Sequence, residues 1–122
     1  MFWKRNKSAH EGIAWIELSD IGQIDSLIEE SKTQTVLIYK HSTRCSISSM
    51  VLERLDRTWT SEGHDIKPYY LDLITFRDIS NAVADRFGIY HESPQVIMLK
   101  DGKATYDASH MSISFAAIKD QA

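Results

Sequence analysis

The hydrophobic and polar positions alternate between two patterns along the chain. Short runs such as Val36–Tyr39 and Val96–Leu99 are apolar at every position, which is typical of strands buried on both faces of a parallel sheet. The segments between these runs place apolar residues three or four apart, which is the spacing of an amphipathic helix. The pattern predicts strands over residues 14–18, 34–40, 66–73, 95–100 and 103–107, and helices over residues 21–30, 45–61, 79–87 and 113–119.

Turn and cap residues fall between these segments. Asp101-Gly102 is a hairpin signal, because a tight hairpin turn needs residues that tolerate positive φ. The remaining expected signals are Ser19-Asp20 and Ser112 as helix N-caps, Gly63 as the stop of the second helix and Gly88 as the end of the third. The apolar stripe expected to bury the second helix is Ile47, Met50, Val51, Leu55 and Trp59.

The resulting order is β-α-β-α-β-α-β-β-α. Right-handed βαβ crossovers put helices on both faces of a parallel core, and the hairpin adds an antiparallel pair. We therefore expect a three-layer α/β fold with a mixed central sheet flanked by helices. The 122 residues suit one domain, with residues 1–12 as a loosely held N-terminal extension.

Composition narrows the function classes. The formal net charge of −3 argues against general nucleic-acid binding, and no apolar run approaches the roughly 20 residues that cross a membrane. The basic residues near the start of the chain precede no apolar stretch of the signal-peptide kind. We therefore expect a cytoplasmic protein with neither nucleic acid nor membrane as a partner.

The single cysteine is the most informative residue. One thiol makes no internal disulfide and supplies no zinc site alone, which leaves Cys45 as either an inert core residue or a reactive group. Its neighbours are polar, and it lies where a buried strand passes into a helix. Unpaired N–H groups and the helix dipole favour an anion there, and such positions lower a cysteine pKa from about 8.5 to roughly 3.5–7.5. His41 and Arg44 would add positive charge, so the reactive thiol is the favoured interpretation.

Other positions leave alternatives open. Ser48 stands one helical turn after Cys45, where it either hydrogen-bonds the thiolate or bonds a nearby backbone carbonyl. Pro94 opens a strand, and base rates alone favour a trans peptide bond there. Asp72 faces the active side or simply ends its strand. The five histidines lack metal-ligand spacing, and no phosphate-loop, dinucleotide or hydrolase motif occurs, so we expect no metal or bound cofactor.

Several segments together resemble the YtxJ-like monothiol bacilliredoxin family. They are Lys40-His41-Ser42-Thr43-Arg44-Cys45-Ser46-Ile47-Ser48, residues 70–74, residues 76–81, His91-Glu92-Ser93-Pro94-Gln95-Val96-Ile97 and residues 108–110. The resemblance implies a thioredoxin-like fold, with Cys45 as the attacking cysteine and Pro94 as a cis-proline facing it. Ser48 then takes the place of the resolving cysteine of dithiol relatives. One departure is Ser46, where the family usually has proline.

The resemblance also implies an activity. A Cys45 thiolate would remove bacillithiol from mixed disulfides on client proteins, with bacillithiol, a low-molecular-weight thiol, as co-substrate and no bound cofactor. The residues expected to support the thiolate or contact substrate are His41, Thr43, Arg44, Ser46, Ser48, Ser93 and Pro94. Two rivals remain: a non-catalytic binding module of the same fold, and a glutathione-dependent monothiol glutaredoxin-like protein.

Overall fold

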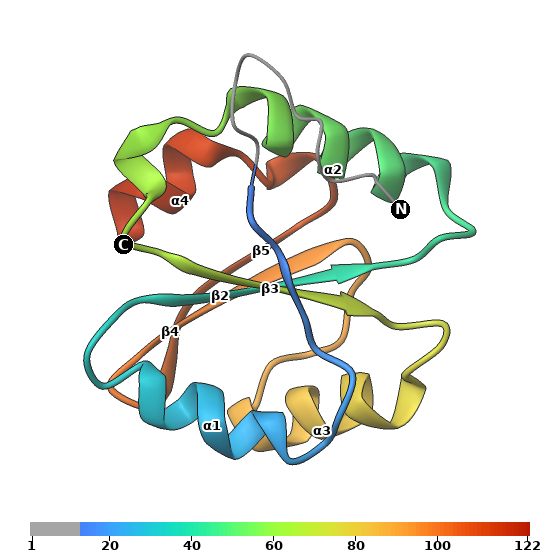
Figure 1. The fold of residues 1–122 in the computed structure, drawn as a ribbon. Coiled ribbons are helices and arrows are strands. Elements are labelled where there is room, and N and C mark those ends of the chain that lie inside the picture. Colours follow the sequence, from blue (N-terminus) through green and yellow to red (C-terminus); the bar gives the residue numbers. More distant parts are fainter. Residues whose placement is uncertain (1–12) are drawn as a thin grey trace.

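The computed structural model describes residues 13–122, and its centre is a five-stranded mixed sheet (Figure 1). The spatial order is β1-β3-β2-β4-β5; β1 and β2 run parallel to β3, whereas β4 is antiparallel to both β2 and β5. The strands are β1 (Ile16–Glu17), β2 (Val36–His41), β3 (Lys67–Asp72), β4 (Gln95–Lys100) and β5 (Lys103–Ser109). The helices are α1 (Gln23–Glu30), α2 (Ser46–Thr58), α3 (Arg77–Phe87) and α4 (Phe115–Gln121), with short 3₁₀ helices at Ser61–Gly63 and His110–Ser112.

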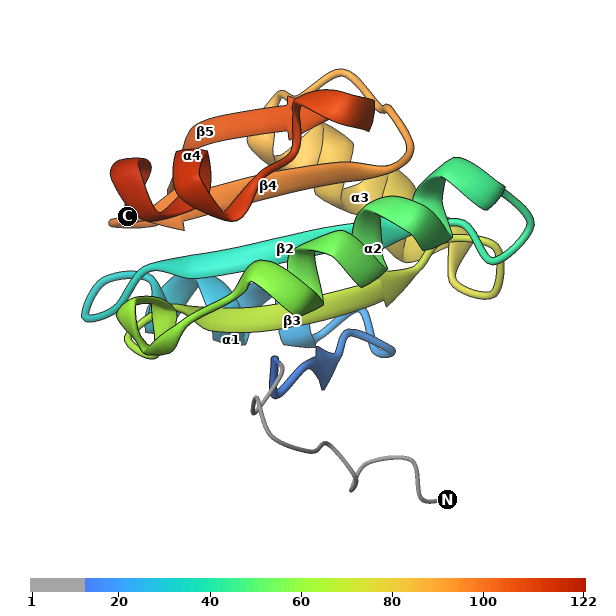
Figure 2. The same cartoon turned by 90° about the horizontal axis from the view of Figure 1, so that it is seen from above.

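Helices α2 and α4 cover one face of the sheet and α1 and α3 cover the other, so the described residues form the three layers expected from the sequence (Figures 1 and 2). Leu37 and Tyr39 of β2 belong to the core under α2 and α4, whereas Val36 and Ile38 belong to the core over α1 and α3. Side chains alternate between the faces of a strand. All six residues of β2 are buried, because helices pack on both sides of it.

The second helix buries only part of the stripe expected for it, and Trp59 of that stripe packs partly buried against the core. Ser48, Val51 and Leu55 face the sheet, while Ile47 and Met50 remain 45% and 47% exposed. The buried residues repeat at i, i+3 and i+7, and the two expected core residues lie beside that stripe. The helix ends at Thr58 because Trp59 is already extended, at φ −69° and ψ 132°, so Gly63 is not its stop signal.

Three helix boundaries rest on particular residues. Gly88 ends α3 in the left-handed conformation, at φ 65° and ψ 34°, as its position in the sequence predicts. Ser114, not Ser112, caps α4, since its hydroxyl accepts the Ala117 N–H at 3.1 Å. The N-cap of α1 is Gly22 and not Ser19-Asp20.

The Asp101-Gly102 hairpin forms as expected, with φ of 54° and 78° at the two turn residues. The expectation of an extension over residues 1–12 falls outside the described residues. Among residues 13–122, no helix combines the length and the apolar character needed to span a lipid bilayer.

Candidate functional site at the end of strand β2

The chain places the cysteine segment and the proline segment at one end of the sheet. Strand β2 runs directly into the turn before Cys45, and β4 begins immediately after Pro94. The two strands are antiparallel, and Lys40 pairs with Gln95. The end of β2 therefore lies beside the start of β4, and Figure 2 shows both connections at the same end of the molecule.

Cys45 is the N-cap residue of α2 and is partly exposed. Its backbone is extended, at φ −112° and ψ 118°, and its carbonyl accepts the Ser49 N–H at 3.2 Å, which starts the helix. Its own N–H donates to the Ser42 carbonyl at 3.1 Å, which closes the turn after β2. Cys45 therefore lies at the N-terminal end of α2, where unpaired N–H groups and the positive end of the helix dipole favour an anion.

Ser48 fastens the first turn of α2 to the end of β2. Its fully buried hydroxyl lies 2.7 Å from His41 Nδ1 and accepts the Ser42 N–H at 3.1 Å. Its carbonyl accepts the Tyr39 hydroxyl at 2.9 Å. The Ser48 side chain thus bonds His41 of the strand and Ser42 of the turn, which fixes the loop that carries Cys45.

His41 is buried and packs among aromatic rings. Its ring centroid lies 6.1 Å from that of Tyr39 and 5.6 Å from that of Tyr70. Burial lowers the pKa of His41 below its ordinary value of 6.5, although the Asp72 carboxylate acts in the opposite direction. His41 is therefore uncharged at neutral pH. The expectation that His41 adds positive charge near the thiol is therefore wrong. His41 contributes to the site through its contact with Ser48.

Tyr39 lies within electrostatic reach of the thiol. Burial raises the pKa of its hydroxyl to about 12; the hydrogen bond to Ser48 opposes this shift, and Tyr70 and the Cys45 charge reinforce it. The phenol consequently stays protonated and remains a hydrogen-bond donor to α2 over the physiological range. The sequence pattern marked Tyr39 only as a core residue.

The other expected site residues differ in exposure. Thr43, Arg44 and Ser46 are exposed around the turn, so they are accessible to a substrate. Asp72 ends β3, and its carboxylate accepts N–H groups of Ile74 and Thr75 and the Thr75 hydroxyl. Asp72 thus closes the turn after its strand, which is the second of the two interpretations open from the sequence.

The Ser93–Pro94 peptide bond is cis, as the family resemblance implies and against the base rate for proline. Pro94 is buried, and its carbonyl accepts the His110 N–H at 3.0 Å. Sequence reasoning missed Lys40 and His91, whose side chains meet beside this segment at 3.0 Å. The sequence did hold one signal for this contact, because Lys40 is a charged residue that directly follows the apolar run of β2.

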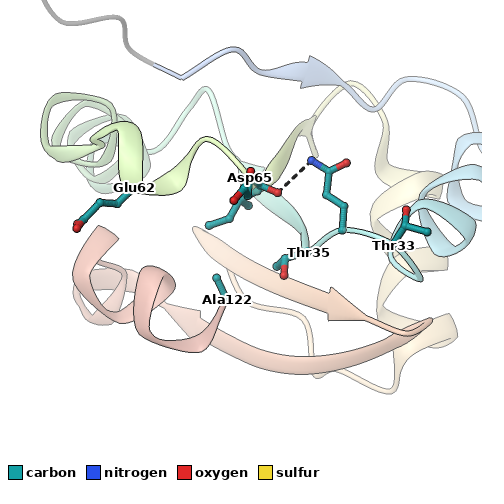
Figure 3. A pocket seen from close by; sticks show the side chains of 7 residues that line it. Thr33, Thr35, Glu62, Asp65 and Ala122 are labelled. Atoms are coloured by element: carbon teal, nitrogen blue, oxygen red, sulfur yellow. Dashed lines mark hydrogen bonds between the residues drawn. The ribbon is translucent and has the colours of Figure 1, made fainter.

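A hollow lies at the opposite end of the sheet (Figure 3). It is lined by Thr33, Gln34, Thr35, Glu62, Asp65, Ile66 and Ala122. These residues precede β2 and β3, or lie near the chain end, whereas Cys45 follows β2. Gln34 Nε2 donates to the Asp65 carbonyl at 3.0 Å across this hollow. The hollow is therefore separate from the thiol site.

Comparison with known proteins agrees with this geometry. The family model described as Monothiol bacilliredoxin BrxC matches residues 16–118. A solved structure described as a candidate oxidoreductase with a thioredoxin fold is 29% identical, with a TM-score of 0.75 over 87% of this chain and 91% of that chain. The thioredoxin of Malassezia sympodialis is 18% identical, with a TM-score of 0.72 over 96% of this chain and 97% of its own. A Schistosoma mansoni thioredoxin is 24% identical, with a TM-score of 0.65 over 87% and 90% of the two chains. The expected thioredoxin-like fold is confirmed.

Proposed function

The chain belongs to the monothiol bacilliredoxin family, and from that premise we propose that Cys45 removes bacillithiol from mixed disulfides on protein cysteines. The family, the thioredoxin fold and the single cysteine support a thiol oxidoreductase. The observation that carries the finer proposal is the half-buried sulfur at the start of α2, at the same end of the sheet as the cis-proline segment. A helix N-terminus favours an anion in general, and a partly exposed sulfur there is accessible to a disulfide.

The reaction consists of two exchanges. The Cys45 thiolate attacks the bacillithiol sulfur of the mixed disulfide; a sulfur–sulfur bond forms between Cys45 and bacillithiol, and the client thiolate leaves and takes a proton from water. A second bacillithiol thiolate then attacks the bacillithiol sulfur of the adduct. This step frees the Cys45 thiolate and yields bacillithiol disulfide, so one mixed disulfide and one thiol give one client thiol and one small disulfide.

The second thiol has to come from outside, because the chain holds one cysteine. Ser48 stands one turn after Cys45, but a hydroxyl makes no disulfide, and its bonds go to His41 and Ser42. Bacillithiol is therefore a co-substrate and not a bound cofactor. The reaction needs a reduced pool of small thiols, and we place it in the bacterial cytoplasm on that ground.

The surface beside Cys45 suits a protein client. Ile47, Met50 and Met111 are large apolar residues that are each between 45% and 54% exposed, and the first two lie on the first turns of α2. Met111 lies in the 3₁₀ helix after β5, and its carbonyl accepts a hydrogen bond of 3.4 Å from Arg54 Nη2 of α2. Exposed Arg44 offers a positive charge to the carboxylates of the bacillithiol malate part. The main chain next to Pro94 would pair with an extended segment of the substrate.

The test is release of bacillithiol from a model client protein, followed by intact mass. We expect wild type with added bacillithiol to free the client thiol, and a single bacillithiol adduct to accumulate on Cys45 when free thiol is withheld. Cys45→Ser should lose both signals. Ser49→Ala, an exposed serine on the same helix, is the matched control and should behave as wild type.

Three outcomes contradict the proposal. Release by Cys45→Ser at the wild-type rate excludes the thiol as the attacking group. Absence of any adduct in wild type favours a non-catalytic binding module. Faster discharge of the adduct by glutathione than by bacillithiol assigns the protein to the glutaredoxin-like alternative.

A further inference from the structure

The next-to-last residue of strand β2 is a lysine that has no exposure to solvent. Lys40 is 0% exposed, and its side chain follows Val36 and Ile38 toward the face covered by α1 and α3. Burial lowers the pKa of its ammonium to about 8. Within residues 13–122, this ammonium makes a hydrogen bond of 3.0 Å to Nδ1 of His91. A buried cation is costly, so a position that keeps one with no carboxylate partner among residues 13–122 calls for a role.

The partner of Lys40 across the strands holds the same loop. Gln95 pairs with Lys40 in register and is 1% exposed. Its Nε2 donates to the Tyr90 carbonyl at 3.0 Å, and its Oε1 accepts the Glu92 N–H at 3.4 Å. Two opposed side chains thus reach three consecutive residues, Tyr90, His91 and Glu92, which lead directly into the cis peptide bond at Ser93–Pro94.

The far side of the same segment is also attached. The Pro94 carbonyl accepts the His110 N–H at 3.0 Å, and the His110 ring lies 3.6 Å from the Glu92 carboxylate. The segment is therefore fixed after the cis bond by backbone pairing with the end of β5. Before the cis bond, the segment is held by the side chains of Lys40 and Gln95.

We propose that Lys40 and His91 are positioning residues, whose hydrogen bond holds the loop before Pro94 so that the Ser93 main chain is presented to the mixed disulfide. The inference rests on the proposed function for its effect on the substrate, but the attachment of the loop stands on the contacts alone. His91 is exposed and Lys40 is fully buried, so the histidine closes the loop over the ammonium.

The hydrogen bond depends on the charge of His91. An ammonium only donates, so the contact requires an unprotonated Nδ1 and places the ring proton on Nε2. Burial, Lys40 and Arg77 at the start of α3 all lower the pKa of His91, while Glu92 acts in the opposite direction. Glu92 is itself shared with His110 of the 3₁₀ helix after β5. The bond therefore stands at neutral pH and is lost in acid, when His91 becomes a second cation beside the ammonium.

The test compares His91→Ala, which removes the acceptor, with His91→Asn, whose side-chain oxygen reaches the place of Nδ1. Hydrogen exchange of the Glu92 amide reports on the loop, because that N–H bonds Gln95. We expect exchange, corrected for intrinsic rates, to be about fivefold faster in His91→Ala, the size of one net hydrogen bond, and to return in His91→Asn. The matched control is His64→Ala, another exposed histidine whose Nδ1 contacts a carbonyl, that of Ser61, at the opposite end of the sheet.

Turnover supplies the second measurement. KM for the mixed disulfide should rise about fivefold in His91→Ala with kcat unchanged, because the loop positions substrate and leaves the sulfur untouched. The acid fall in kcat/KM that His91 protonation causes in wild type should be absent in His91→Asn. Lys40→Met should reproduce His91→Ala, and the exposed His91 variants decide the matter if that buried variant fails to fold.

The inference is overturned if Glu92 exchanges in His91→Ala as it does in His64→Ala, or if His91→Asn fails to restore the protection. Equal KM in His91→Ala and wild type removes the link to substrate. A wild-type protein that releases no bacillithiol refutes the proposed function instead, and the exchange measurement still decides whether the loop is held.

Discussion

Two neighbouring residues at the end of β2 show how strongly burial acts on a single side chain. Lys40 and His41 lie on opposite faces of the sheet, and burial lowers the pKa of both. A lowered pKa in a basic group means that the folded protein binds the proton less tightly than the unfolded chain does. The charged form of Lys40 therefore reduces the stability of the fold at neutral pH.

This imbalance predicts a pH dependence of stability. Between about pH 8 and its ordinary pKa of 10.5, Lys40 is deprotonated in the folded protein but protonated in the unfolded chain, so stability rises with pH over that interval. We expect the free energy of unfolding of wild type, relative to Lys40→Met, to increase by about 2 kcal/mol from pH 8 to pH 10. Urea titrations of both proteins at each pH measure it. The raised pKa of Tyr39 lowers the free energy of unfolding of both proteins in the alkaline range, so this effect cancels from their difference. A pH-independent difference would contradict the prediction.

At the scale of the element, the start of α2 decides how the thiol is presented. Ser46 is the first helical residue, and Cys45 before it has φ −112° and ψ 118°. That extended conformation is the one that a residue before proline prefers, and proline itself is favoured at the first helical position. The backbone is therefore ready for the proline that the family usually has here.

Ser46→Pro is expected to raise the free energy of unfolding by about 0.5 kcal/mol, because proline restricts the unfolded chain without straining this backbone. It should also slow alkylation of Cys45 by iodoacetamide at neutral pH, since it removes one N–H next to the sulfur. Urea unfolding and alkylation rates measure the two effects. Ser49→Pro, which would take away the N–H that donates to the Cys45 carbonyl, is the contrasting variant and should destabilise. Loss of stability in Ser46→Pro would refute the argument.

Element identity and order were predictable from the sequence, whereas helix faces and ends were less so. The apolar run of β2 and the Asp101-Gly102 turn are local signals, and the structure confirms both. Ile47 and Met50 match the helical period as well as Val51 does. Only the direction from which the sheet approaches α2 selects Ser48 as the buried residue, and a local pattern does not carry that direction.

At the scale of the whole molecule, one close aromatic contact lies at the end of the sheet opposite the thiol. Gly63, in the 3₁₀ helix that precedes β3, lies against Trp59 and Phe115, whose ring centroids are 4.7 Å apart. A Cβ at Gly63 would stand 2.7 Å from the Trp59 ring and 2.8 Å from the Phe115 ring. These rings join α2 to α4 away from the thiol.

Gly63→Ala should therefore lower the free energy of unfolding by about 1–3 kcal/mol, the usual cost of overpacking, while Cys45 alkylation stays at the wild-type rate. Thermal or urea unfolding gives the first quantity. Gly22→Ala is the control, because its added methyl meets the movable Asp20 carboxylate at the surface. A slower or faster thiol in Gly63→Ala would show that the two ends of the sheet are coupled.

Only part of the candidate site could be predicted from the sequence, because some of its contacts depend on how the whole chain folds. Cys45, Ser48 and Pro94 are recognised by chemistry or by family resemblance, and each lies in one short segment. Lys40 and His91 are 51 positions apart and become a pair only through the register of β2 against β4. Long-range pairing of this kind is set by the fold, so no local pattern announces it.

The alternation along β2 also restricts how this protein can change over generations. Lys40 bonds His91 of the loop on one face of the sheet, and His41 contacts Ser48 on the other face. Each side chain points to its face because of its position along the strand. One inserted or deleted residue would exchange the two faces, turning the cation toward Ser48 and the imidazole toward the loop. Lineages that keep Lys40 and His41 in place can replace other residues between Val36 and Cys45 one at a time, but they have to keep the length of that stretch constant.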